Sequence, residues 1–142
     1  MITGIHHTGI WVSDIQKLLP FYCDILGMEI TQDSGVMSGP AVATLTGVRG
    51  ARVRAVMLQM GGQAWEFLEL VTPDAKPLPD DAPYAQVGRG HIAFQVDDIE
   101  ATYKALEEKG VRFVCTPQEA KGVKFCYFRD PEGLQVEIVE PT

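Results

Sequence analysis

The sequence is short of basic residues, and this shortage excludes one class of partner. Lys and Arg number 12 against 19 Asp and Glu, which gives a net charge of −7 at pH 7. Proteins that bind nucleic acids need a basic face to contact the phosphate backbone. We therefore expect no nucleic-acid partner.

Long hydrophobic runs and cysteine patterns are missing as well. No run of 18 apolar residues occurs, so the sequence predicts no membrane span. The first residues lack the basic segment and apolar stretch of a signal peptide. The three cysteines, Cys23, Cys115 and Cys126, show neither zinc-binding spacing nor a disulfide framework. We expect buried free thiols and a cytoplasmic location.

Internal repetition is what the sequence does contain. The segments 7–15 and 91–99 match at one offset, and 68–73 resembles 136–141. Each half therefore opens on a histidine and closes on a glutamate, which indicates a duplicated module. The positions matched in the opening segments are His7 and His91, Val12 and Val96, Asp14 and Asp98, and Ile15 and Ile99.

Each half is predicted to contain a strand, a helix and three further strands. The first helix is expected to begin at Ser13 and the second at Asp97. Pro20 should kink or split the first helix. The predicted strands are 3–12, 28–31, 53–59 and 65–71, a further one at 42–45, and then 90–96, 111–114, 124–129 and 134–139.

The chain length of 142 residues suits a single domain with its own core. Within it we predict a first module at 1–73, a proline-rich linker at 74–88 and a second module at 89–142.

Four polar side chains interrupt strands that otherwise read as core: His7, Glu69, His91 and Glu137. An unpartnered buried carboxylate costs several kcal/mol. Two imidazoles and two carboxylates satisfy one another around a divalent cation such as Ni, Co, Mn, Zn or Fe. A lone strand histidine is more often a hydrogen-bonded core residue than a ligand, but the repetition favours the metal site.

Three neighbouring polar residues are not expected to be metal ligands. Glu66 and Glu140 lie one strand face away from the proposed ligands, and both are interpreted as solvated. His6 alternates with His7 along the strand, so it is not expected to join the site.

At these residues the chain resembles the vicinal oxygen chelate superfamily, which includes glyoxalase I, methylmalonyl-CoA epimerase, extradiol dioxygenases and the bleomycin-resistance proteins. The similar segments are His7-Thr8-Gly9-Ile10, Phe21-Tyr22 with Leu26-Gly27, Gly90-His91-Ile92-Ala93-Phe94 with Val96-Asp97-Asp98, and Arg129-Asp130-Pro131-Glu132-Gly133 ahead of Val136-Glu137-Ile138. They cover nearly the whole chain in order and spacing.

The resemblance implies an α+β fold of two tandem βαβββ modules that form a curved, mostly antiparallel sheet cup around a metal site. Carried over by position, the metal ligands are His7, Glu69, His91 and Glu137. A set of four ligands favours the glyoxalase I or epimerase type. The implied reaction is proton transfer alpha to a carbonyl by an isomerase, epimerase or lyase, with Glu137 and Glu69 as candidate bases.

Two other functions stay open at this point. An Fe(II)-dependent ring-cleaving dioxygenase would use only His7, His91 and Glu137. A metal-free protein that binds a small molecule or antibiotic would need none of the ligands.

The expected partners are a small-molecule substrate and a second copy of the chain, because some family members build each site across a dimer interface. Alternation along the strands suggests Trp11, Phe67, Gln95, Gln135 and Tyr127 as lining residues.

Overall fold

The computed structural model describes residues 1–73, 76–77, 79 and 83–141. These residues form two compact units, Met1–Pro77 and Leu78–Thr142, and each is described by itself. Residues 74–75, 78 and 80–82 of the predicted linker lie outside the described part. In the described part, no helix is long and apolar enough to cross a membrane.

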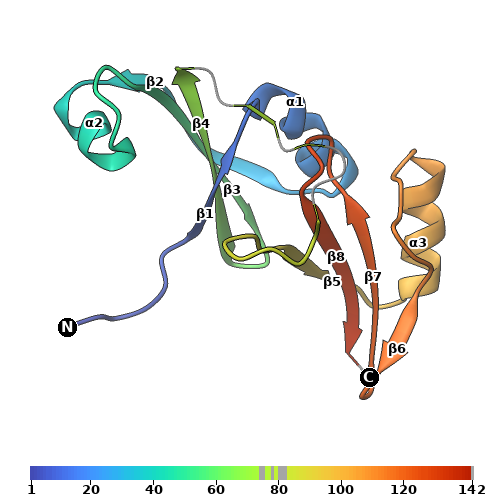
Figure 1. Cartoon of the computed structure of the whole chain (residues 1–142). Coiled ribbons are helices and arrows are strands. Elements are labelled where there is room, and N and C mark those ends of the chain that lie inside the picture. Colours follow the sequence, from blue (N-terminus) through green and yellow to red (C-terminus); the bar gives the residue numbers. More distant parts are fainter. Residues whose placement is uncertain (74–75, 78, 80–82, 142) are drawn as a thin grey trace. The chain divides into compact units, whose positions relative to one another are not determined.

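The first unit is a four-stranded mixed sheet in the order β1-β4-β3-β2 (Figure 1). Strand β1 runs parallel to β4, and the other neighbours are antiparallel. Its elements are β1 (Thr8–Val12), α1 (Ile15–Leu19), the π-helix η1 (Pro20–Ile25), β2 (Glu29–Ser38), α2 (Pro40–Thr46), β3 (Arg52–Met60) and β4 (Gln63–Thr72).

The second unit repeats this plan in the order β5-β8-β7-β6, again with a parallel pair made by its first and last strands. The expected α+β fold of two βαβββ modules is thus confirmed, with α2 as an addition to the first. The elements are β5 (Ile92–Gln95), α3 (Ile99–Glu108), β6 (Gln118–Ala120), β7 (Val123–Arg129) and β8 (Gln135–Pro141).

The strand predicted at 42–45 is wrong, because this segment belongs to helix α2. Pro40 occupies the first turn, where its missing N–H costs nothing. Gly47 ends the helix in the left-handed conformation, with φ of 70°. Val42 is the buried residue of the helix and packs near Val53 on β3.

The helix starts were predicted one residue too early. The N-cap of α1 is Asp14 rather than Ser13, and the N-cap of α3 is Asp98 rather than Asp97. Each aspartate accepts a hydrogen bond from the backbone N–H three residues on, at 3.2 Å for Asp14 and 2.9 Å for Asp98. The predicted break at Pro20 is confirmed, since α1 ends there and η1 begins.

The opening strands of both units begin later than predicted, at Thr8 and Ile92. His7 and His91 therefore immediately precede their strands. The strand predicted at 111–114 is reduced to one antiparallel bridge, between Phe113 and Phe128. A short strand, β6, follows it instead.

Each unit has a core on the face of the sheet that its first helix covers, and in the first unit Val42 of α2 also packs with Val53 and Leu70 on the opposite face. In the first unit, the rings of Tyr22 and Phe67 meet with centroids 4.9 Å apart, and both are fully buried. In the second unit, Phe113 lies between Tyr103 of α3 and Phe128 of β7. Because strand side chains alternate, the neighbouring strand residues point to the opposite face.

All three cysteines are free thiols, as predicted, but only Cys126 is buried. Its Sγ donates a hydrogen bond to the carbonyl of Cys115 at 2.9 Å. Burial raises the pKa of Cys126 to about 12, so it remains a thiol at neutral pH. Cys23 and Cys115 are half-buried, and the prediction of burial is wrong to that extent.

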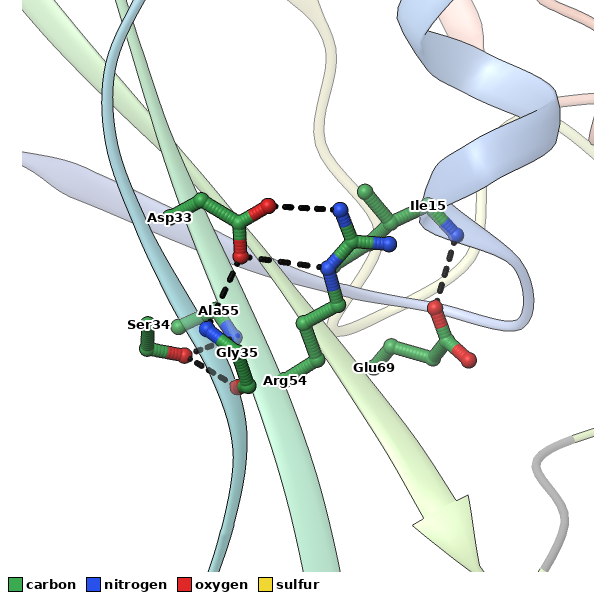
Figure 2. A network of polar contacts seen from close by, with 7 residues as sticks. All are labelled: Ile15, Asp33, Ser34, Gly35, Arg54, Ala55 and Glu69. Carbon is green, nitrogen blue, oxygen red and sulfur yellow. Dashed lines mark hydrogen bonds and ion pairs between the residues drawn. The ribbon is translucent and has the colours of Figure 1, made fainter.

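A glutamate on the last strand of each unit binds the start of that unit's helix. The carboxylate of Glu69 accepts the N–H of Ile15 at 2.9 Å (Figure 2). The carboxylate of Glu140 accepts the N–H of Ile99 at 2.8 Å. Backbone N–H groups in the first turn have no partner within the helix, and a carboxylate also suits the helix dipole. These two glutamates therefore fasten helix to sheet.

Glu140 should make the stability of the protein depend on pH. Its pKa is lowered by the hydrogen bond from Ile99 and then by Lys124, whose Nζ lies 3.2 Å away. A lowered pKa means that this stabilisation is present above the ordinary glutamate pKa of about 4.3 and is lost as the pH falls through the folded value. Glu140→Gln should therefore lower the urea midpoint at pH 7 and make little difference at pH 2.

The control is Glu108→Gln, which removes an exposed carboxylate from the end of the same unit's helix. It should shift the midpoint equally little at both pH values. An equal loss of stability by Glu140→Gln at pH 7 and pH 2 would contradict the assigned role.

Candidate active site

In the second unit, the histidine and the glutamate predicted as ligands lie together. The Nε2 atom of His91 is 3.0 Å from Oε2 of Glu137. Strand pairing explains the contact, because Ala93 lies opposite Glu137 in the parallel β5–β8 pair. The His91 side chain is 40% exposed and that of Glu137 only 14%, so the imidazole can be reached by a ligand.

Tyr127 supports this pair from the other neighbouring strand. It lies opposite Glu137 in the β7–β8 register, and its ring meets the His91 ring edge-on with centroids 5.6 Å apart. Burial and a hydrogen bond to Glu137 raise the pKa of the Tyr127 phenol. Tyr127 therefore keeps its proton at neutral pH and remains a donor to the carboxylate.

In the first unit, His7 lies beside Glu66. Its Nε2 atom is 3.3 Å from Oε2 of Glu66. Gly9 lies opposite Glu66 in the β1–β4 pair, and a Cβ at this glycine would be 3.3 Å from the same carboxylate oxygen. The open space at Gly9 lets the Glu66 side chain lie across β1 towards His7.

The structure does not bring Glu69 to His7. Glu69 lies three residues beyond Glu66 on β4, so the two side chains leave opposite faces of the sheet. Its carboxylate binds Ile15 on the helix side, next to Arg54 and Asp33 in the network of Figure 2. The solvated interpretation of Glu66 is wrong, because its carboxylate contacts His7.

Both closing strands contain two glutamates at the same spacing. Glu66 and Glu69 on β4 correspond to Glu137 and Glu140 on β8, since the first of each pair contacts the histidine and the second contacts the helix. Matching 68–73 to 136–141 shifted the comparison by three residues. The spacing Glu-x-x-Glu, present in both halves, was the signal that identifies Glu66.

Residues predicted to line the site differ in the face of the sheet on which their side chains lie. Trp11 is 46% exposed and leaves β1 on the same face as Gly9. Tyr127 lies at the pair itself, as described above. Phe67 is fully buried against the helix, so its prediction as a lining residue is wrong.

The donors present suit a divalent metal of the first transition row. Imidazole nitrogen and carboxylate oxygen are common ligands of Zn, Fe, Ni and Mn. Each unit contributes one such pair, and among the described residues no cluster of three or more candidate ligands occurs.

The comparison with protein families bears on these two pairs. The sequence profile of the Glyoxalase/Bleomycin resistance protein/Dioxygenase superfamily matches residues 4–138. The chain belongs to this superfamily. The match covers both His–Glu pairs, including the whole of β1 and β4 and most of β8.

Individual relatives agree with this membership. A probable lactoylglutathione lyase of Synechocystis is 30% identical, over 96% of this chain and 94% of the relative. A 2-epi-5-epi-valiolone epimerase of Actinomyces is 27% identical, over 96% and 78%. The crystal structure of a glyoxalase family protein from Bacillus cereus covers 99% of this chain and 95% of its own, with a TM-score of 0.82 and 21% identity. This last similarity shows the fold alone.

Proposed function

We propose that this protein is a divalent-metal-dependent enzyme that transfers a proton next to a carbonyl group of a small-molecule substrate. The observation that carries the proposal is the repeated His–Glu pair, His7 with Glu66 and His91 with Glu137. A lyase and an epimerase among the relatives of the chain support chemistry of this kind.

The proposed ligands are His7, Glu66, His91 and Glu137, with Glu66 in place of Glu69. Glu69 already accepts the N–H of Ile15, and it leaves the sheet on the other face. When bound, the metal would supply a Lewis acid that stabilises the negative charge developing on the substrate oxygen.

Glu137 is the residue best equipped to accept the proton. The Nε2 atom of His91 lies 3.0 Å from its Oε2, and Tyr127 lies opposite Glu137 in the β7–β8 register, so residues before β5 and on β7 flank the carboxylate. General base catalysis requires a positioned carboxylate within reach of the proton that it removes. Tyr127 is a positioning residue in this scheme.

The test is metal content per chain, measured by mass spectrometry on protein purified without chelator. Near-stoichiometric Ni, Co, Mn or Zn is expected, followed by incorporation of solvent deuterium next to the carbonyl in glyoxalase and epimerase assays. Iron together with oxygen uptake would indicate a dioxygenase instead. A chain that takes up no metal on titration would contradict the proposal.

The same samples test the assembly that we propose, a homodimer. Mass measurement of the metal-free and metal-loaded protein in solution should give twice the chain mass. A monomer at all concentrations would exclude a site built from two copies.

A further inference from the structure

Two arginines oppose each other across neighbouring segments of the second unit. Phe113 pairs with Phe128 in an antiparallel bridge, and the N–H of Val114 donates to the carbonyl of Tyr127 at 2.8 Å. This register places Arg112 opposite Arg129. Like charges directly opposite each other destabilise a sheet unless a negative group lies near them.

These arginines line a pocket of about 410 Å³ together with Tyr84, Phe113, Val114 and Pro131. The Nε of Arg129 donates to the Tyr84 hydroxyl oxygen at 2.6 Å, and its guanidinium carbon lies 4.2 Å from the centre of the Tyr84 ring. Both contacts orient the Arg129 guanidinium at the pocket.

Among the described residues of the lining, Asp130 is the acidic one, and its carboxylate binds the backbone. Asp130 is 5% exposed, and its Oδ1 accepts the backbone N–H groups of Glu132 and Leu134, both at 2.9 Å. Among the residues that the structure describes, no carboxylate forms an ion pair with Arg112. Two guanidinium groups and one carboxylate thus belong to the described lining of the pocket.

One wall of the pocket, Arg129, leaves β7 on the same face as Tyr127, which contacts His91, whereas Phe113 lines the pocket from the helix side. Phe128 points to the helix side, so Tyr127 and Arg129 both point to the other face. Two residues along a strand correspond to about 7 Å. A small molecule of ordinary size spans this distance.

We propose that this pocket binds the carboxylate or phosphate group of the substrate while its reacting carbonyl lies at the His91–Glu137 pair. Guanidinium groups bind such anions through paired, charge-assisted hydrogen bonds. The apolar surfaces of Phe113, Val114 and Pro131 would contact the carbon chain beside the anion. The assignment to a substrate rests on the proposed function, whereas anion binding by itself does not.

The experiment is a titration of the metal-free full chain with inorganic phosphate and, separately, with acetate, followed by NMR chemical shifts. The variants are Arg112→Gln, Arg129→Gln and Arg129→Lys. Lys104→Gln on α3 is the matched control, because it removes one exposed positive charge of the same unit outside the pocket. Circular dichroism establishes that each variant is folded.

The unaltered chain should bind at least one of the two anions saturably, with shifts at residues 112–114 and 129–133. Each Arg→Gln change should weaken binding at least about tenfold, Arg129→Lys should weaken it less, and Lys104→Gln should leave it unchanged. Tighter binding of phosphate than of acetate would identify a phosphorylated substrate, and the reverse a carboxylate.

Equal binding by the unaltered chain and Arg112→Gln, or no binding of either anion, would overturn the proposal. These outcomes are separate from those for the metal. A chain that binds phosphate at the arginines but takes up no metal retains the pocket and loses the proposed function. A chain that takes up metal but binds neither anion at the arginines retains the proposed function and loses the anion pocket.

Discussion

Replacing Glu66 by glutamine is expected to lower the affinity for the divalent metal by more than about 100-fold, because changes to groups that merely support a ligand already cost 10- to 100-fold. The neutral amide of glutamine is a weaker metal donor than a carboxylate. The His7 imidazole, which lies 3.3 Å from the Glu66 carboxylate, would then have a neutral amide beside it. Metal affinity is measured by competition with a chromophoric chelator at fixed pH.

Glu69→Gln is the matched control, since it changes the same side chain on the same strand. Glu69 faces the helix and accepts the N–H of Ile15, so its replacement should leave metal affinity unchanged. The amide oxygen of glutamine can still accept this N–H, so only the loss of the charge at the helix start should reduce stability, by about 0.3 to 1 kcal/mol. If Glu69→Gln abolished metal binding while Glu66→Gln did not, the assignment would be reversed and the ligand set first read from the sequence restored.

Glu137→Gln is expected to reduce turnover by about 10²- to 10⁴-fold at saturating metal, which is the usual contribution of a general base. The amide cannot accept a proton at neutral pH, although Tyr127 and His91 would still contact it. Saturating metal separates this loss from weaker metal binding. The measurement is the rate of solvent deuterium incorporation into the substrate.

Glu140→Gln serves as the comparison for this variant. Glu140 lies three residues further along β8 and binds the start of α3 on the opposite face, so its replacement should leave turnover unchanged at pH 7. Turnover by Glu137→Gln within threefold of the unaltered enzyme would remove Glu137 from the chemical step.

Much of the architecture was predictable because the chain repeats itself. The alternation of strands and helices and the break at Pro20 follow from local pattern, and both units share one strand order. The two histidines were predicted inside the opening strands, whereas they lie just before β1 and β5. Segment 42–45 failed because β-branched residues resembled a strand. The helix there depends on Pro40 and Gly47 at its ends and on the burial of Val42.

The contacts of the four predicted ligands were predictable only in part. Alternation along one strand predicts which of its side chains share a face. It does not predict which of them lies next to a given side chain of another strand. That depends on register, here the pairing of Gly9 with Glu66 and of Val12 with Glu69. In the second unit, the two residues predicted as ligands, His91 and Glu137, do lie beside each other.

The order of strands in each sheet has a consequence for synthesis of the chain. Among the described residues, β1 pairs only with β4 and β5 only with β8. The first strand synthesised in each unit therefore has no partner strand until the last one has been made. The helix N–H groups of Ile15 and Ile99 likewise find their carboxylates 54 and 41 residues later. A growing chain thus leaves each sheet unfinished until its final strand emerges, and these distant contacts slow folding. A premature stop before residue 135 would therefore leave β5 without a neighbour and His91 without its glutamate.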